Sequence, residues 1–280
     1  MKSIRNENEA VVGIVVTVLL IGLAVSITVM INTVYVPHWT EELEAAHMNQ
    51  VVNQFVSFKQ HVDVQAMIEQ NTALSSWFTL GSKELPILGS GRTFGRLTII
   101  EDSYMITIVS DEDDAADVII RTESMNFESG NSYFVSQNYI YENGALILQQ
   151  GDANILIGKP NFFVSSFGQN LSFTIFDIQS PIGKRAASGY GITSVQTQVT
   201  EVDFYEIVLV TDIIIQTNYP NSWIVAMNST LKQLDSGFTT DDYTITSTDD
   251  SVTLSFIDEY PSLHVKEATI FTQITPGWIE

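Results

Sequence analysis

The acidic side chains of Asp111–Asp114, together with Asp117, are the densest group of possible metal ligands in the chain. Carboxylate oxygens suit Ca²⁺, but an EF-hand loop also needs a glycine at its sixth position and a glutamate at its twelfth, and both are missing. The pairs Asp241–Asp242 and Asp249–Asp250 are shorter and bracket a predicted strand. We interpret all three groups as solvated acidic turns and predict no metal site.

The remaining residues that could do chemistry are scattered. The histidines are His38, His47, His61 and His264. A helical pair of metal-binding histidines needs a spacing of three or four residues, which none of them has. The chain has no cysteine and no G-x-S-x-G, H-E-x-x-H, P-loop or Rossmann glycine pattern. We therefore predict no catalytic residue, no cofactor and no enzyme activity.

The chain carries two possible modification sites, and its overall charge argues against one class of partner. Asn170-Leu171-Ser172 and Asn228-Ser229-Thr230 are possible N-glycosylation sites, with Asn170 and Asn228 as acceptors. The net charge is −21 and the pI is about 4.3. Nucleic-acid binding requires clustered Lys and Arg, so this composition argues against a nucleic-acid partner.

The element that dominates the chain is an apolar run from Ala10 to Ile31. As a helix its 22 residues would extend about 33 Å, enough to cross the hydrocarbon core of a bilayer. No charged residue lies between Ala10 and Thr40. A cleaved signal peptide would have a shorter apolar core and a small-x-small cleavage site. We predict an uncleaved helix over 10–36 that spans a membrane or forms a filament core, and a cytoplasmic or leader-like tail over 1–9.

The charge distribution predicts the orientation of this helix. The short flank carries Lys2, Arg5, Glu7 and Glu9 together with the α-amino group, and the strongly acidic remainder of the chain follows the apolar run. Short basic flanks stay in the cytoplasm, whereas long acidic domains are exported readily. We therefore expect a cytoplasmic N-terminus and a mostly extracellular protein at the cell membrane or cell surface.

Residues 37–80 predict an amphipathic stalk helix that follows a kink at Pro37, with Thr40 as its N-cap. Its apolar positions recur at helical spacing. The residues that we expect to pack on the outer domain are Val51, Val52, Phe55, Phe58 and Val62. The expected polar face contains Glu44, Asn49, Gln50, Asn53, Lys59 and Asp63.

Residues 81–280 predict an extracellular, mostly antiparallel β domain with one inserted helix over 220–234, so the fold class is α+β. The expected strands are 94–100, 104–109, 118–122, 139–141, 145–149, 171–178, 191–200, 204–216, 251–257 and 265–275. Asn143-Gly144 is the strongest hairpin signal, because Asn-Gly suits a type I′ turn. A second hairpin is expected at 101–103. A break near Pro160 suggests two sheets, or two small domains.

The N-terminal run also resembles the start of archaeal type IV pilin-like proteins. There, an acidic residue followed by Ala-Val and a nearby glycine opens a hydrophobic helix, as in Asn8–Val16 here. Other stretches resemble membrane-anchored surface proteins of the same archaeal group: Val36–Trp39, Glu44–Val51 with Phe55, Tyr139–Ala145 and Tyr219–Trp223. Residues 1–9 lack the Gly or Ala that ends the leader of filament-forming pilins.

The resemblance implies a structural subunit of a surface filament, with apolar helices bundled in the core and β domains outside. Its partners would be the membrane and copies of itself. Gly13, Gly22 and Ala24 would allow close helix packing, and Glu9 would pair with the free amino group of a neighbouring subunit. The alternative is a single-pass anchored surface protein that binds cell-wall or S-layer components without polymerising.

Overall fold

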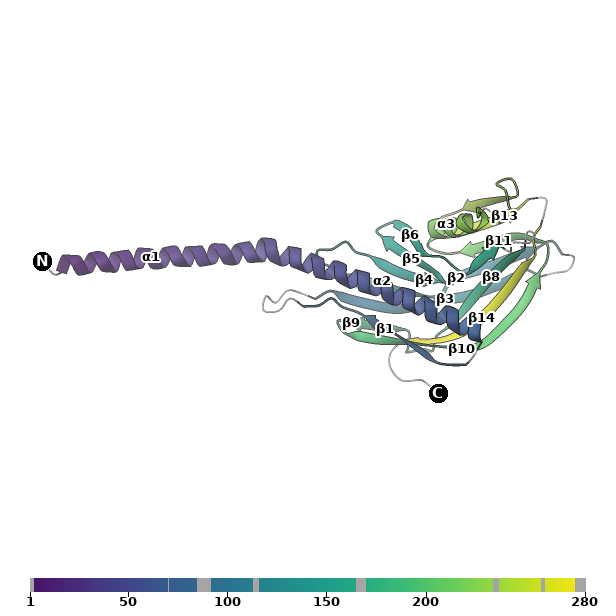
Figure 1. Cartoon of the computed structure of the whole chain (residues 1–280), viewed down its shortest axis with the longest axis horizontal. Helices are drawn as coiled ribbons and strands as arrows, with labels where there is room; N and C mark the ends of the chain where they lie inside the picture. The colour runs from purple at the N-terminus through teal and green to yellow at the C-terminus, as the bar shows by residue number, and fades with distance from the viewer. Residues whose placement is uncertain are drawn as a thin grey trace.

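The computed structural model describes residues 3–69, 71–84, 92–112, 116–164, 170–233, 237–257 and 260–274, with side chains from residue 11 onward. Figure 1 shows one long apolar N-terminal helix leading into a β-rich domain. The helical elements are α1 (Ser3–Met30), the π-helix η1 (Ile31–Tyr35), α2 (Val36–Ile68) and α3 (Pro220–Leu231). The observed architecture is therefore a helix followed by a mostly antiparallel β domain.

Residues 3–68, about a quarter of the chain, form one continuous helical rod. Pro37 lies in the first turn of α2, where its ring would clash with the carbonyl of the preceding turn. The widened turn η1 relieves this clash, and the Val36 N–H reaches back to the Ile31 carbonyl. The predicted N-cap at Thr40 is wrong, because the helix runs through this residue and its hydroxyl donates to the Val36 carbonyl at 2.8 Å. The helix ends at Ile68, so part of the predicted stalk, residues 74–79, is instead a strand.

A five-stranded sheet forms one side of the domain. Its strands, in spatial order, are β1 (Leu74–Thr79), β10 (Ile192–Ile207), β14 (Leu263–Ile274), β8 (Leu171–Gln179) and β7 (Phe162–Val164). All neighbours pair antiparallel except β14 and β8, which are parallel. Because β1 directly follows α2 and pairs with β10, it places the helix along the edge of this sheet.

A nine-stranded sheet forms the other side. Its path is β12 (Tyr243–Ser247), β13 (Ser251–Phe256), β11 (Val210–Gln216), β2 (Phe94–Ser110), β3 (Val118–Gly130), β4 (Asn138–Glu142), β5 (Ala145–Gln150) and β6 (Ala153–Gly158), and β9 (Ala186–Gly189) also pairs with β2. The long strands β2 and β3 bend, and the register between them shifts between Ile100 and Tyr104. The neighbours along this path are antiparallel.

Residues with positive φ mark where the predicted turns and strand ends agree with the structure and where they differ. The β4–β5 hairpin at Asn143-Gly144 is confirmed, and both residues have positive φ, 44° and 77°. The predicted hairpin at 101–103 is wrong, because β2 continues through it with Asp102 at φ 46°. The predicted strand 204–216 is interrupted instead, at Leu209, where φ is 50°.

The predicted division near residue 160 needs correction. The chain does leave the nine-stranded sheet after β6 and enter the five-stranded sheet at β7. It then returns to the nine-stranded sheet at β9 and crosses between the two sheets again at β10, β11 and β14. The sheets are therefore interleaved in sequence rather than consecutive.

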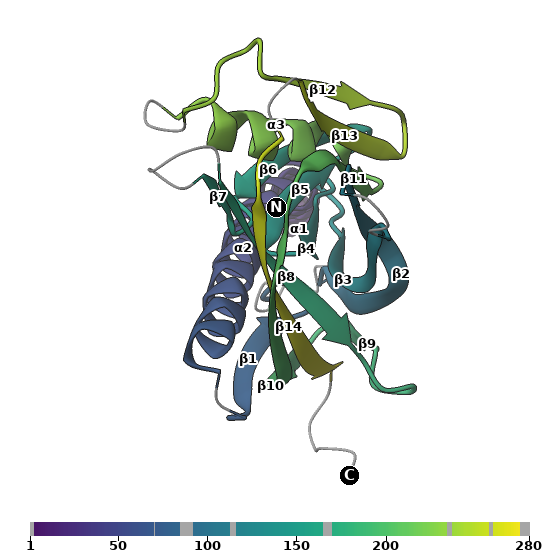
Figure 2. The same cartoon turned by 90° about the vertical axis from the view of Figure 1, so that its right-hand side faces the viewer.

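Two apolar clusters fill the space between the sheets and the helices. Val51, Phe55, Phe58 and Val62 of α2 are fully buried in one cluster, and Val52 is half-buried against it. Helix α3 supplies Trp223 and its neighbours to the other cluster, and lies against β6, β7, β12 and β13. Figure 2 shows α2 along one side of the domain and α3 across its end. Each buried Phe of α2 contributes about 2 kcal/mol by removal of apolar surface from water.

Candidate functional site

From Val11 to Met30 the surface of α1 is apolar and exposed on all sides of the helix. Its large aliphatic side chains between Val11 and Val29 are each 48% to 67% exposed. Figure 1 shows α1 projecting well clear of the β domain. A soluble monomer rarely exposes an apolar patch larger than a few hundred Å², so this surface requires a cover of lipid or of other helices.

The few polar side chains of α1 are satisfied within the helix. Thr17 donates to the Gly13 carbonyl at 2.8 Å, Ser26 to the Gly22 carbonyl at 2.8 Å and Thr28 to the Ala24 carbonyl at 2.9 Å. Hydroxyl groups bonded in this way need no water. The helix can therefore enter a medium without hydrogen-bonding solvent. Among the described residues, the one helix long and apolar enough to cross a membrane is Val11–Ile68.

No contact within the described chain requires a glycine at position 13 or 22 of α1. A Cβ added at Gly13 or Gly22 would meet nothing within 4 Å, yet each glycine costs a helix interior about 1 kcal/mol relative to alanine. At about 100° per residue, Gly13 and Ala24 share one face, and Gly22 lies on the opposite face. The small residues would thus let neighbours approach from two sides. The side chain of Glu9 lies outside the described part of the chain.

The outer end of the apolar run carries an aromatic pair. The Tyr35 and Trp39 rings have centroids 5.6 Å apart and are 40% and 38% exposed. Exposed Tyr and Trp are typical of the level at which a spanning helix meets water. His38, which precedes Trp39, lies 3.5 Å from the Glu42 carboxylate, so ionisable side chains begin at the level of this pair.

Glu44 fixes the helix to the domain. Its carboxylate is 1% exposed and accepts hydrogen bonds from the backbone N–H groups of Ser132 (2.8 Å), Tyr133 (2.9 Å) and Phe134 (2.6 Å). The Thr93 hydroxyl donates a fourth at 3.2 Å. The expectation that Glu44 belongs to the polar face is wrong, because the residue is buried and its carboxylate accepts from backbone N–H groups 88 to 90 residues away in sequence.

Further contacts hold α2 along the edge of the five-stranded sheet. His47 Nε2 bonds to the Thr79 carbonyl at 2.8 Å, and the Thr79 N–H donates to Gln54 Oε1 at 3.0 Å. Burial lowers the pKa of His47, which favours its neutral form. Near the end of the helix, Gln65 Nε2 donates to the carbonyls of Thr72 and Thr197 at 2.7 and 2.9 Å. Hydrogen bonds along its length therefore hold α2 against the domain, and α1 projects from this fixed helix.

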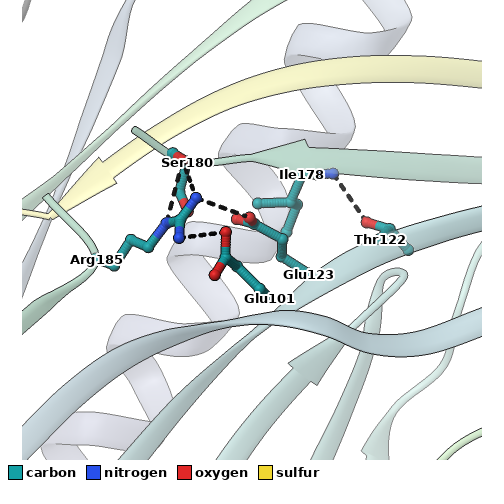
Figure 3. Close-up of polar contacts among 6 residues, drawn as sticks. All are labelled: Glu101, Thr122, Glu123, Ile178, Ser180 and Arg185. Atoms are coloured by element: carbon teal, nitrogen blue, oxygen red, sulfur yellow. Dashed lines mark hydrogen bonds and ion pairs between the residues drawn. The ribbon is translucent and has the colours of Figure 1, made fainter. Parts of the chain in front are cut away.

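The two sheets are themselves cross-linked by a polar cluster (Figure 3). Arg185 donates from Nε to the Ser180 hydroxyl at 2.8 Å and pairs with Glu101 and Glu123 of the nine-stranded sheet. Thr122 accepts the Ile178 N–H at 3.0 Å. Burial raises the pKa of Glu123. We interpret the cluster as structural, because its carboxylates face a fixed guanidinium and no cavity opens at it among those described.

The remaining predicted sites are placed as follows. Asp111, Glu112 and Asp117 are exposed, and Asp113 and Asp114 lie outside the described residues. Within the described ranges, no three His, Asp or Glu side chains come together in a way that could hold a metal ion. Asn170 precedes β8 and Asn228 lies on α3, and both are half-buried.

Comparisons with models of protein families, with curated proteins and with solved structures found no match to this chain. The class of the protein is therefore defined by its architecture alone. It is a β-rich domain carried on one long helix whose first half is bare and apolar.

Proposed function

We propose that the chain is a pilin-like structural subunit of an archaeal surface filament. In this proposal the α1 helices bundle into the filament core and the β domains form the outer shell. Before assembly, α1 resides in the membrane. Its lack of any unsatisfied polar side chain among the described residues 11–30 suits both environments.

The observation that carries the proposal is the combination of a bare helix with glycines that the subunit itself does not use. A helix that only spans lipid has no need of Gly13 or Gly22, since added Cβ atoms would point into open space. Close packing against other helices does need small residues. The rigid seating of α2 by Glu44 supports the same function, because force along a filament would pass through this joint.

The orientation in the proposal follows from charge. The basic residues Lys2 and Arg5 lie before the apolar run, and the long acidic part of the chain lies after it. The N-terminus would then be cytoplasmic and the β domain extracellular. The net charge of −21 keeps such domains soluble at high surface density.

A second function is favoured by the aromatic pair at the end of the apolar run. Tyr35 and Trp39 lie where an interfacial belt would sit on a helix that stays in the bilayer. A single-pass surface protein that binds cell-wall or S-layer components would use this belt throughout its life. A filament subunit would use it only before assembly.

Two variants separate these functions. Glu9→Gln removes the carboxylate that is proposed to pair with a neighbouring N-terminus, and Gly22→Leu blocks close approach on one face. If the chain is a filament subunit, both variants abolish filaments in electron micrographs of cell surfaces while Val18→Leu, a size change at an exposed α1 position, does not. Filaments of normal length with Gly22→Leu would count heavily against the proposal.

A further inference from the structure

A groove whose lining has no Asp, Glu, Lys or Arg runs between α2 and the edge strand β1. We call it the α2–β1 groove and define it by Asn49, Gln50, Asn53, Ser57, His61 and Trp77, which line it. Its volume is about 730 Å³. The whole chain, by contrast, has 33 acidic and 12 basic residues. None of the roles described above uses this groove.

The groove is long. A second cavity of about 300 Å³ adjoins it, sharing Ala46 and Gln50, continuing toward Leu43 and Ile192 and bringing one charged residue, Lys83, to its lining. From Leu43 to His61 the helix rises about 27 Å at 1.5 Å per residue. A ligand that fills this length is a chain of several units rather than a single small molecule.

The lining offers one apolar platform and a row of fixed polar groups. The Trp77 side chain is 64% exposed, an unusual position for so large an apolar ring. Asn53 Nδ2 donates to the Asn49 carbonyl at 2.8 Å, and Gln50 Nε2 donates to Thr79 Oγ1 at 2.9 Å. These bonds hold both amides in place and leave their oxygens as acceptors for a ligand.

An extended peptide does not fit as an added strand. Thr79 N–H and C=O both bond to side chains of α2, and His61 Nδ1 lies 2.8 Å from the Ser76 hydroxyl. The helix is thus tied directly to the edge of β1 at two levels, leaving no space for another strand between them. An acidic ligand is disfavoured too, since the α2–β1 groove lacks a Lys or Arg, the adjoining cavity has Lys83 alone, and the chain is strongly acidic.

We propose that the α2–β1 groove binds a neutral oligosaccharide. Sugar rings present an apolar face of C–H groups, which stacks on an indole ring, and a rim of hydroxyls that donate to and accept from amides. Trp77 is the stacking platform, and Asn49, Gln50 and Asn53 bond the hydroxyls. The proposal is independent of whether the chain forms filaments, because the groove belongs to a single subunit.

The test uses the full chain in a detergent without a sugar headgroup, because a glycosidic detergent would compete. The protein is applied to an array of neutral hexose and N-acetylhexosamine oligosaccharides, with uronic-acid oligosaccharides alongside. The neutral oligosaccharide that binds best is then titrated calorimetrically against wild type, Trp77→Ala, Trp77→Phe and Asn53→Ala. Phe163→Ala is the matched control, an aromatic 57% exposed outside the groove.

We expect a neutral oligosaccharide to bind, Trp77→Ala and Asn53→Ala to weaken binding by about tenfold or more, and Trp77→Phe to retain most of it. Phe163→Ala should bind as wild type does. Circular dichroism melts confirm that each variant is folded. The proposal is overturned if no neutral oligosaccharide on the array binds, if uronic-acid chains bind more tightly, or if folded Trp77→Ala binds like wild type.

Discussion

Glu142 is a carboxyl group buried beside Trp223, at the start of the β4–β5 turn. Its Oε2 accepts hydrogen bonds from the Thr217 hydroxyl at 2.8 Å and from the Trp223 indole N–H at 3.0 Å. Burial outweighs these bonds and raises the pKa of Glu142 to about 7. The group is therefore neutral in the folded protein under mildly acidic conditions.

This raised pKa predicts how stability depends on pH. Between the ordinary value of 4.5 and about 7, the folded chain keeps the proton that the unfolded chain has lost. The free energy of unfolding therefore falls as the pH rises through this window, by about 3 kcal/mol from this group. Glu142→Gln cannot titrate, so urea denaturation should give a wild-type-minus-variant difference that changes by this amount between pH 4.5 and 8.

The exposed Glu41→Gln provides the control for that measurement, since it makes the same substitution outside the buried core. If the stabilities of wild type and Glu142→Gln run parallel from pH 4.5 to 8, the Glu142 carboxyl group does not titrate in this window in the folded protein.

The burial of single residues was predictable where apolar spacing alone decides it. Phe55 and Phe58 are placed by helical periodicity, and both rings lie edge-on to Phe78. Glu44 and Glu142 were not predictable as buried residues. A carboxylate normally faces water, and the backbone N–H groups and indole that hold these two lie far away in the sequence.

At the scale of elements, the joint between α2 and the loop after β3 has the sharpest consequence. Glu44→Ala would leave the N–H groups of Ser132, Tyr133 and Phe134 without their acceptor. Losing a charged acceptor shared by several buried donors costs about 3 kcal/mol or more. We expect a clear drop in melting temperature and faster hydrogen exchange at these three amides.

Glu41→Ala is the matched control, because Glu41 is exposed on the same helix and such changes stay within about 0.5 kcal/mol. Equal stability of Glu44→Ala and Glu41→Ala would show that the hydrogen bonds between Glu44 and the loop after β3 do not stabilise the fold.

Elements with a strong local signal were predictable, and those defined by distant pairing were not. The α1 segment follows from its uninterrupted apolar run, and α2 follows from its helical periodicity and from the absence of Pro and Gly between residues 37 and 81. The β4–β5 hairpin follows from Asn143-Gly144. Strands β1 and β9, and the parallel pairing of β14 with β8, depend on partners more than 85 residues away in sequence, as their registers show.

At the scale of the whole molecule, the β domain and α1 differ in how they cover their apolar side chains. The domain buries its own in two clusters, whereas α1 exposes them from Val11 to Met30. The filament proposal says that copies of α1 cover each other. The chain contains no cysteine, so a single introduced cysteine reports one contact without background. Ala24 shares a face of α1 with Gly13 and is exposed, which makes it the position to test.

The decisive measurement is oxidative cross-linking of Ala24→Cys in material sheared from the cell surface. We predict covalent dimers in this sheared fraction on a non-reducing gel, because neighbouring α1 helices meet in the filament core. Thr246→Cys, exposed on β12, should stay monomeric. If the chain is absent from the sheared fraction, or if Ala24→Cys remains monomeric there, the α1 helices do not form a filament core and the anchored-monomer function replaces the filament.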